Sequence, residues 1–131
     1  MSRSLTSPLR WPAAALLVVV AAVHVPLVPD HLEEAPYVGV LFLALAVVSV
    51  VLAALLVTRD TRLVWAASGL VTLLALLAFV ASRTAGLPEL GDDVGNWTEP
   101  LGFPAVAAEA AVSIIAARTL RRSPQAVHRR G

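Results

Sequence analysis

The stretch Tyr37–Val57, "YVGVLFLALAVVSVVLAALLV", contains no charged residue. A helix rises ~1.5 Å per residue, so about 20 apolar residues are enough to cross the ~30 Å hydrocarbon core of a bilayer. Lipid offers the backbone no hydrogen-bond partner, and a single stretch that crosses it must therefore be a helix. The stretch predicts a transmembrane helix in an integral membrane protein. The lipid bilayer is therefore an expected partner of the chain.

Three further apolar stretches flank this one, namely Trp11–Val28, Leu63–Val80 and Leu101–Leu120, of which the last is the least hydrophobic. A glycine and a proline that follow Ala85 form a helix-stop signal, so the third helix is expected to continue to that residue. Short connections favour antiparallel neighbours. The sequence predicts an all-α fold, a four-transmembrane-helix bundle in up-down-up-down order. The predicted helices cover about 11–28, 37–57, 63–85 and 101–120, in one domain over residues 1–120.

The composition agrees with a membrane protein and excludes several classes of site. Hydrophobic residues make up 58% of the chain and charged residues 15%, whereas a soluble domain has about a quarter of its residues charged. The absence of cysteine excludes disulfides, thiolate nucleophiles and Cys-based zinc or iron–sulfur sites. All ten basic residues are arginine, which, with the abundance of Ala, Val and Leu, is typical of a GC-rich bacterial genome. The formal net charge of +1 argues against a nucleic-acid partner.

The charges also predict an orientation, because excess arginine marks cytoplasmic loops. The arginines of the chain ends and of the second connection are Arg3, Arg10, Arg59, Arg62, Arg118, Arg121, Arg122, Arg129 and Arg130. The acidic residues of the first and third connections are Asp30, Glu33, Glu34, Glu89, Asp92, Asp93 and Glu99, with Arg83 as the only base among them. Both termini are therefore expected in the cytoplasm, with 121–131 as a basic tail, in a multi-pass protein of the cell inner (cytoplasmic) membrane.

A cleaved signal peptide over the first stretch is the alternative interpretation. Its basic start, apolar run and small residues at Ala21 and Ala22 fit such a peptide. The apolar run, however, continues past that point to Val28, and cleavage would place the new N-terminus outside. The distribution of arginine therefore favours an uncleaved first helix.

Glu109 lies inside the fourth apolar stretch, roughly 12 Å from its outer end at ~1.5 Å per residue. An acidic residue near the bilayer centre costs about 2.5–3.5 kcal/mol on insertion scales, so it usually faces the bundle interior and is paired or protonated. His24 lies about one helical turn from it in depth and is the expected partner. Arg83 is a second candidate, and it needs a counter-charge of its own. The acids that could supply this counter-charge are Glu33, Glu34, Glu99 and Glu109.

The outer half of the predicted bundle therefore gathers ionisable side chains, which mark a functional site by default at membrane depth. The alternative is a structural clasp that fixes the order of the helices. The candidates for a ligand or proton site are Glu109, His24, Arg83, His31, Glu34, Glu99, Tyr37 and Trp97.

A metal is a weaker hypothesis. His24, His31 and Glu109 offer nitrogen and oxygen ligands, but their spacing matches no ligand signature. The segment "GDDVGN" (91–96) lacks the oxygen spacing of a calcium loop and is expected to be a turn. No motif for a cofactor, a phosphate or an activated nucleophile is found, so no cofactor is expected and an enzyme has little support.

The segments "DHLEEAPYVGVLFLALA" (30–46) and "SRTAGLPELGDDVGNWTEPLGFPAVAAEAA" (82–111) resemble a family of small four-helix bacterial integral membrane proteins. Its motifs are S-R-T-x-G-L-P and W-x-E-x-L-G in the outer loop. The resemblance implies a four-helix topology and draws attention to these outer-loop motifs as candidate functional residues. It implies no reaction. It does not extend to the first helix. The matching residues are His31, Glu34, Tyr37, Gly39, Leu41, Phe42, Ser82, Arg83, Thr84, Gly86, Leu87, Pro88, Trp97, Glu99, Leu101, Gly102 and Glu109.

Two functions fit these residues. The first is a non-enzymatic subunit or assembly protein, whose alanine-rich face suits contact within a homo-oligomer or a larger membrane complex. The second is binding or transport of a small ligand, a metal or a proton through an outward-facing pocket built on Glu109, His24 and Arg83. An enzyme of the membrane interface comes third. The sequence favours the first of these.

Overall fold

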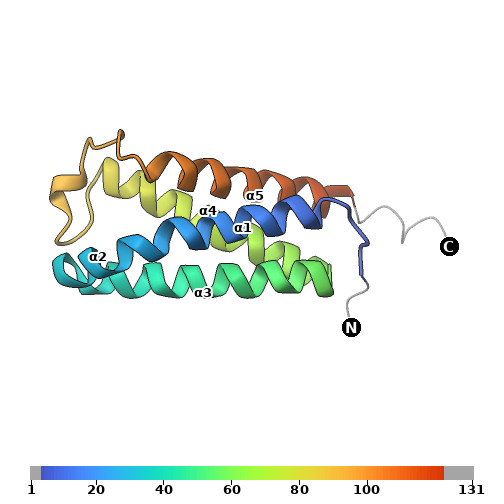
Figure 1. Ribbon diagram of the computed structural model, residues 1–131. Coiled ribbons are helices and arrows are strands. Elements are labelled where there is room, and N and C mark those ends of the chain that lie inside the picture. The colour runs from blue at the N-terminus through green and yellow to red at the C-terminus, as the bar shows by residue number, and fades with distance from the viewer. Residues whose placement is uncertain (1–3, 123–131) are drawn as a thin grey trace.

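The computed structural model describes residues 4–122, and its regular structure is helical (Figure 1). Its elements are α1 (Arg10–His24), the 3₁₀ turn η1 (Val25–Leu27), α2 (Val28–Glu34), α3 (Pro36–Thr58), α4 (Arg62–Arg83), the 3₁₀ turn η2 (Gly91–Asp93) and α5 (Gly102–Arg122). No strand forms within 4–122, and the predicted all-α, four-helix class is confirmed. Of the predicted tail, Arg121 and Arg122 end α5, and 123–131 lie outside the described residues, as does Arg3.

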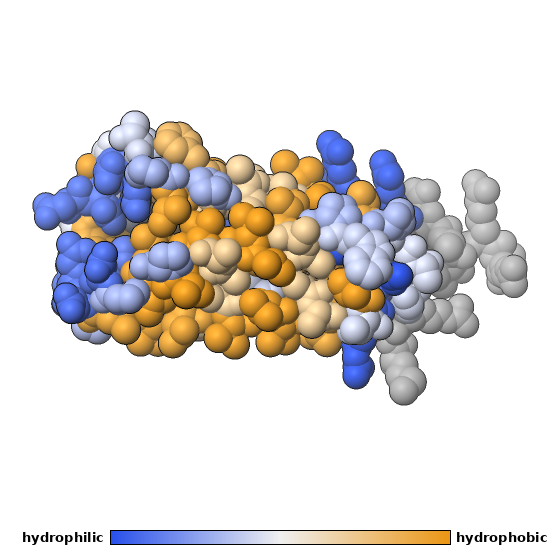
Figure 2. All heavy atoms as spheres, viewed as in Figure 1, coloured by the Kyte–Doolittle hydropathy of each residue, from blue (hydrophilic) through white to orange (hydrophobic). Residues whose placement is uncertain are grey.

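Four helical spans are long and apolar enough to cross a membrane, which indicates a membrane protein. They are Arg10–Glu34, Pro36–Thr58, Arg62–Arg83 and Gly102–Arg122. Figure 2 shows a hydrophobic band across the middle of the face in view, with hydrophilic residues gathered toward the two ends. Large apolar side chains are exposed along this band, as lipid contact requires. The kind of membrane and the side on which each end lies stay predictions.

Contacts between segments distant in the sequence define the two ends of the bundle. At one end, the Arg62 guanidinium donates to the Leu120 carbonyl at 3.1 Å. At the other, the Tyr37 hydroxyl donates to the Pro88 carbonyl at 2.7 Å. We call the first the Asp60 end (residues 4–10, 58–62 and 118–122) and the second the loop end (residues 25–37 and 84–101).

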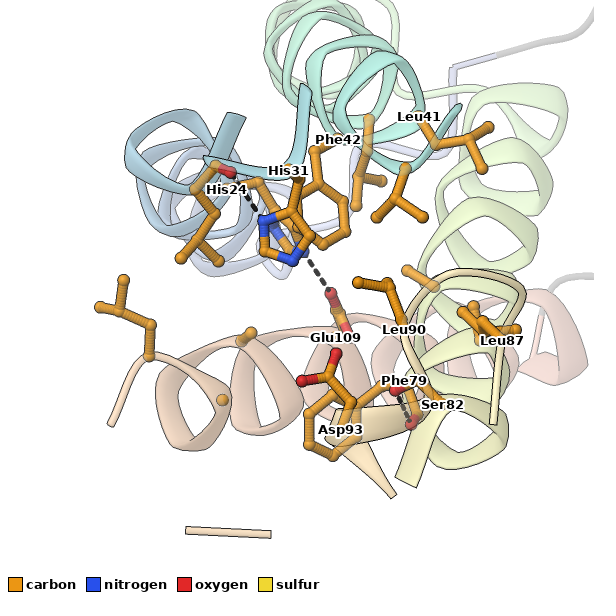
Figure 3. A pocket seen from close by; sticks show the side chains of 18 of the residues that line it. His24, His31, Leu41, Phe42, Phe79, Ser82, Leu87, Leu90, Asp93 and Glu109 are labelled. Carbon is orange, nitrogen blue, oxygen red and sulfur yellow. Dashed lines mark hydrogen bonds and ion pairs between the residues drawn. The ribbon is translucent and has the colours of Figure 1, made fainter. Parts of the chain in front are cut away.

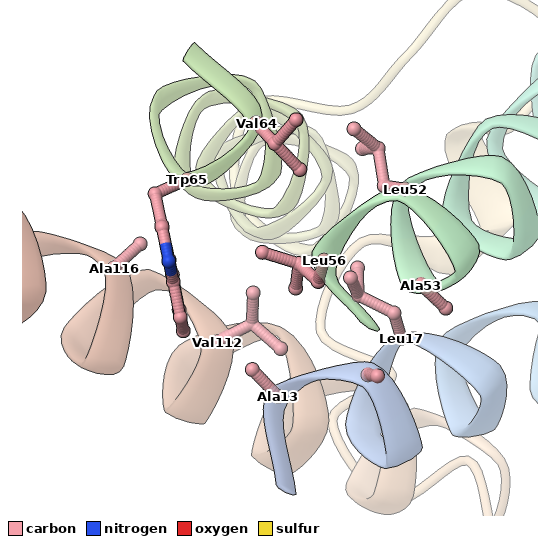
Figure 4. Packing of buried hydrophobic residues seen from close by; sticks show 10 residues of the cluster. Ala13, Leu17, Leu52, Ala53, Leu56, Val64, Trp65, Val112 and Ala116 are labelled. Carbon is pink, nitrogen blue, oxygen red and sulfur yellow. The ribbon is translucent and has the colours of Figure 1, made fainter. Parts of the chain in front are cut away.

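The Asp60 end is closed by a tightly packed apolar cluster (Figure 4). Trp65 reaches from α4 toward α5 alongside Val112 and Ala116, and its side chain is fully buried. Small residues let the helices approach closely: a Cβ added at Gly69 of α4 would lie 3.0 Å from the Ala116 Cβ of α5. The cluster comprises Ala13, Ala14, Leu17, Leu52, Ala53, Leu56, Val64, Trp65, Val112 and Ala116.

Asp60 fixes the N-terminal segment, residues 4–10, to this end. The sequence did not single out this residue, because it lies among the arginines Arg59 and Arg62. Its buried carboxylate accepts hydrogen bonds from the Ser7 backbone N–H at 2.5 Å and from the Trp65 indole Nε1 at 2.6 Å. The Arg10 guanidinium lies 3.8 Å away. Asp60 also adopts a left-handed backbone, with φ of 42°, which Asp tolerates better than most residues. The residue is thus a structural anchor between α1, α4 and the connection before α4.

The first connection is helical where the sequence analysis predicted an acidic loop after Val28. The helical path instead continues through η1 and α2 to Glu34. Pro26 lies in the first turn of η1 and Pro29 in the first turn of α2, where a missing backbone N–H is tolerated. α2 then packs closely on α3, because a Cβ added at Gly39 would lie only 2.7 Å from Leu32. The other bounds differ little, since α4 ends at Arg83 and α5 begins at Gly102.

Candidate functional site: a cavity at the loop end

A cavity of about 450 Å³ lies at the loop end, bounded by all four helical spans (Figure 3). Its volume falls within the ~300–1,000 Å³ typical of small-molecule sites. Its walls are mostly apolar. The polar side chains that line it are His24, His31, Tyr37, Ser82, Arg83, Asp93, Glu99 and Glu109.

The cavity exists because α4 leaves α3 on its way to the loop end. At the Asp60 end, the two helices share the apolar cluster, and Leu56 of α3 packs with Trp65 of α4. Figure 1 shows α4 crossing from the side of α3 toward α5 as it approaches the loop end. Small residues of the diverging walls, such as Ala75, Ala78 and Ala105, leave the space between them unfilled. The hollow is therefore a product of helix direction and side-chain size together.

Glu109 and His24 face each other inside this cavity. The His24 Nε2 lies 3.7 Å from the Glu109 Oε1, and only 2% of the Glu109 surface is exposed. The His24 Nδ1 lies 2.7 Å from the Val20 carbonyl oxygen. A carbonyl can only accept, so this contact requires the proton on Nδ1 and leaves Nε2 as the atom turned to the carboxyl group. The pair can share one proton as acid and imidazole or as carboxylate and imidazolium.

The separation of 3.7 Å is longer than a hydrogen bond. Within residues 4–122, neither carboxyl oxygen of Glu109 accepts a hydrogen bond from the protein. Both groups line the cavity. Glu109 and His24 thus retain hydrogen-bonding capacity that a molecule in the cavity could use.

Arg83, in contrast, has its charge satisfied by residues of the 84–101 segment. Its Nη1 lies 3.1 Å from the Asp93 Oδ2, and its Nη2 lies 3.2 Å from the Glu99 Oε2. The guanidinium also donates to the Ser82 hydroxyl at 3.0 Å and lies 4.6 Å from the centre of the Phe79 ring. Glu99 was among the predicted counter-charges. Asp93 was missed, because the sequence predicted only a turn there.

His31 and Tyr37, both candidates from the sequence, also line the cavity. The His31 Nδ1 contacts the Leu27 carbonyl at 2.8 Å, and its ring lies 4.7 Å from the ring of Phe42. Phe42 also contacts the His24 ring, at 5.0 Å, so one aromatic side chain positions both imidazoles. Tyr37 links the start of α3 to the loop through its bond to Pro88.

Two other candidates lie outside the cavity lining. Glu34 is exposed and forms an acidic surface with Asp30 and Glu33. Trp97 is exposed and packs edge-on against Phe79, with ring centres 6.0 Å apart. Their exposure places them at the polar surface of the loop end.

The structure does not assemble the weak metal candidates into a site. His24, His31 and Glu109 line one cavity, but within residues 4–122 no group of three or more His, Asp or Glu side chains is placed to hold a metal ion. The observed pairing of His24 with Glu109 therefore stands as a two-residue contact.

Hydroxyl groups pack next to Glu109 on the side of the cavity that faces the Asp60 end. The Thr72 and Ser113 hydroxyls lie 2.9 Å apart, and Ser113 donates to the Glu109 backbone carbonyl at 2.8 Å. Thr72 also contacts the Ser68 carbonyl of its own helix at 2.8 Å. Further toward the Asp60 end follows the apolar cluster, with fully buried Leu17 among its members. The cavity thus ends at Glu109.

Comparison of the chain with protein-family models, with curated proteins and with solved structures gives no match. The resemblance to small four-helix bacterial membrane proteins therefore stays a prediction from the sequence motifs.

Proposed function

We propose that the protein binds a small molecule in the loop-end cavity, which faces the outside of the cell inner (cytoplasmic) membrane. The observation that carries this proposal is a cavity with apolar walls in which Glu109 and His24 keep free hydrogen-bonding capacity. Apolar walls with a few convergent polar groups are the usual composition of a ligand site. The outward direction rests on the distribution of arginine in the sequence.

The contrast between Glu109 and Arg83 separates binding from a purely structural role. A structural charge at membrane depth is expected to be paired by the protein, and both Nη atoms of Arg83 are paired, with Asp93, Glu99 and Ser82, while its buried Nε has no hydrogen-bond partner. Glu109 lacks such pairing, since its carboxyl group has only a 3.7 Å contact with His24. Glu109 is therefore proposed as the ligand contact, and Arg83 as the residue that holds the loop over the cavity.

Binding is favoured over transport by the packing beneath the site. The cavity lining ends at Glu109 on α5 and at Val71 on α4. A path toward the Asp60 end would have to cross the apolar cluster, where Leu17, Trp65 and Val112 are fully buried. A binding site that is closed toward the Asp60 end is consistent with this arrangement.

A subunit or assembly protein is the second candidate function. Of the alanines around Glu109 on α5, Ala108 is buried within the chain's own bundle, whereas Ala107 is exposed and Ala110 and Ala111 are half-buried, so part of this face is available for contact with a partner. The acidic surface formed by Asp30, Glu33 and Glu34 also supports this function, since its carboxylates are exposed for a basic partner at the loop end. Such a partner, from a larger membrane complex or from a homo-oligomer, would dock there without using the cavity.

The test exploits the absence of cysteine, which allows single thiols to be introduced without background. Ala105→Cys places a thiol in the cavity lining, and Ala116→Cys places a matched thiol in the closed cluster. With the protein in lipid nanodiscs, an uncharged maleimide is expected to label Ala105→Cys at least about tenfold faster than Ala116→Cys, since burial controls thiol access. Equal labelling of the two variants would contradict an open cavity.

The side of the membrane is tested in intact cells with a membrane-impermeant maleimide. Asn96→Cys at the loop end and Arg59→Cys at the Asp60 end are both exposed. We expect labelling of Asn96→Cys alone. Labelling of Arg59→Cys alone would place the cavity on the cytoplasmic side and overturn that part of the proposal.

A further inference from the structure

The loop end covers the cavity on the side that faces water. Ala35, Val38 and Leu90 form a second buried apolar cluster, against which Leu87 and Phe42 pack. Two sets of polar contacts hold the covering segment in place: the bond from Tyr37 to Pro88, and the pairs of Arg83 with Asp93 and Glu99. A ligand from the aqueous side would have to break these contacts to enter.

The side between α3 and α4 is open instead. Leu41 of α3 and Leu74 of α4 line the cavity, yet they are 58% and 56% exposed. Ala78, one turn further along α4, also lines the cavity and is exposed. All three belong to the apolar spans, so in a bilayer this opening meets lipid tails.

We infer, on the basis of the binding function proposed above, that the ligand is a single-chain amphiphile that enters from the lipid between α3 and α4. Its polar head donates hydrogen bonds and carries no negative charge. The head contacts Glu109 and His24, and the apolar chain extends along the leucines of the opening.

The charged residues that line the cavity determine which polar head group the amphiphile can carry. Besides His24, His31 and Tyr37, the ionisable residues that line it are one arginine, Arg83, and three acids, Asp93, Glu99 and Glu109. Arg83 is paired with two of these acids. An anionic head would therefore meet a surplus of carboxyl groups with no free guanidinium, whereas a hydroxyl or ammonium head can donate to the Glu109 carboxyl group.

The volume of the cavity limits the size of the ligand. The volume of about 450 Å³ lies in the lower half of the ~300–1,000 Å³ range of small-molecule sites. A two-chain phospholipid exceeds this volume, whereas the head and the first part of one alkyl chain fit. The rest of the chain can remain in the lipid between Leu41 and Leu74.

The first arm of the test compares heads on one chain. Tetradecanol, tetradecylamine and tetradecanoate are titrated onto the full-length protein in nanodiscs, and the complexes are measured by native mass spectrometry. The alcohol and the amine are expected to bind at least about tenfold more tightly than the carboxylate, since like charges repel strongly in a site of low dielectric. In Glu109→Gln the amine is expected to lose its affinity relative to the alcohol.

The second arm tests the route. Ala78→Trp fills the opening, and Leu77→Trp places the same side chain on an exposed neighbour that does not line the cavity. Association of the amine is expected to slow about tenfold or more in Ala78→Trp alone, as steric gating predicts. Leu41→Trp on the opposite wall is the second variant, in case Ala78→Trp does not fold.

The outcomes separate this inference from the proposed function. Tightest binding of the carboxylate would overturn the inferred head and leave a binding cavity. Unchanged association in both Ala78→Trp and Leu41→Trp would overturn the lateral route. Failure of all three amphiphiles to bind, while Ala105→Cys remains reactive, would overturn the amphiphile and keep the cavity; an unreactive Ala105→Cys would overturn the function itself.

Discussion

The two ends of this bundle use buried carboxyl groups in opposite ways. Asp60 accepts hydrogen bonds from Ser7 and Trp65, so its charge is satisfied by the protein. Glu109 is as deeply buried, yet its carboxyl group has only His24 nearby, at 3.7 Å. The difference shows that burial of an acid does not by itself reveal its role. What distinguishes the two is whether the surrounding protein fills the hydrogen-bonding capacity of the group.

The packing around the two acids also differs: it is close near Asp60 and leaves a cavity near Glu109. Near Asp60, alanines, leucines and Trp65 fill the space between the helices. Near Glu109, α4 has moved away from α3, and alanines such as Ala75 and Ala78 line a hollow. Close packing stabilises a single arrangement, whereas a hollow of this size loses contacts that a ligand would restore. We therefore expect substitutions at the Asp60 end to affect stability and those at the loop end to affect binding.

The largest effect is expected for Trp65→Ala. Truncating a buried tryptophan costs about 3–5 kcal/mol, because a cavity remains where the ring was. The loss also removes the donor to Asp60. Thermal unfolding in detergent, followed by circular dichroism, measures the effect. Trp97→Ala is the control, since Trp97 is exposed; similar destabilisation by both variants would contradict the assignment of the closed core to the Asp60 end.

A smaller effect is expected for Asp60→Ala. The Ser7 N–H and the Trp65 indole N–H would lose their acceptor, and hydrogen bonds to a charged group contribute about 1.5–3 kcal/mol each at most. We expect a loss of about 2–3 kcal/mol in the free energy of unfolding, because the part-buried Ser7 N–H can bond to water instead and most of the loss comes from the buried Trp65 indole N–H. Asp92→Ala, at an exposed position, is the control. Increased hydrogen exchange of residues 4–10 should accompany the loss, and its absence would show that Asp60 does not hold that segment.

Much of the fold could be predicted from the sequence because lipid imposes a simple rule. A span such as Tyr37–Val57 must be helical whatever its neighbours are. The axial positions of His24 and Glu109 follow from helical rise, and the structure brings them within one cavity. Continuation of the helix through Pro26 and Pro29 was not foreseen, because a proline can begin a new turn as well as end a helix.

The cavity and the partners of the charged residues depend on how the helices pack, and the sequence of one helix does not contain that information. The divergence of α4 from α3 has no signature in hydropathy. Asp60 was overlooked because Arg59 and Arg62 dominate its segment in a charge-based topology argument. Asp93 was overlooked because a turn was the better local prediction, and the turn η2 does form; only the return of residues 84–101 over Arg83 gives its carboxylate a partner.

The smallest effect on stability, and the sharpest test of the comparison, is expected for Glu109→Gln. The substitution keeps the shape of the side chain, and no protein hydrogen bond to its carboxyl group is lost within residues 4–122. The free energy of unfolding should therefore change by less than about 1 kcal/mol, in contrast to Asp60→Ala. Binding of tetradecylamine should nevertheless weaken about tenfold or more, since a charge-assisted hydrogen bond becomes a neutral one. If Glu109→Gln instead unfolds the protein as Asp60→Ala does, then both acids are structural, and the distinction between the two ends fails.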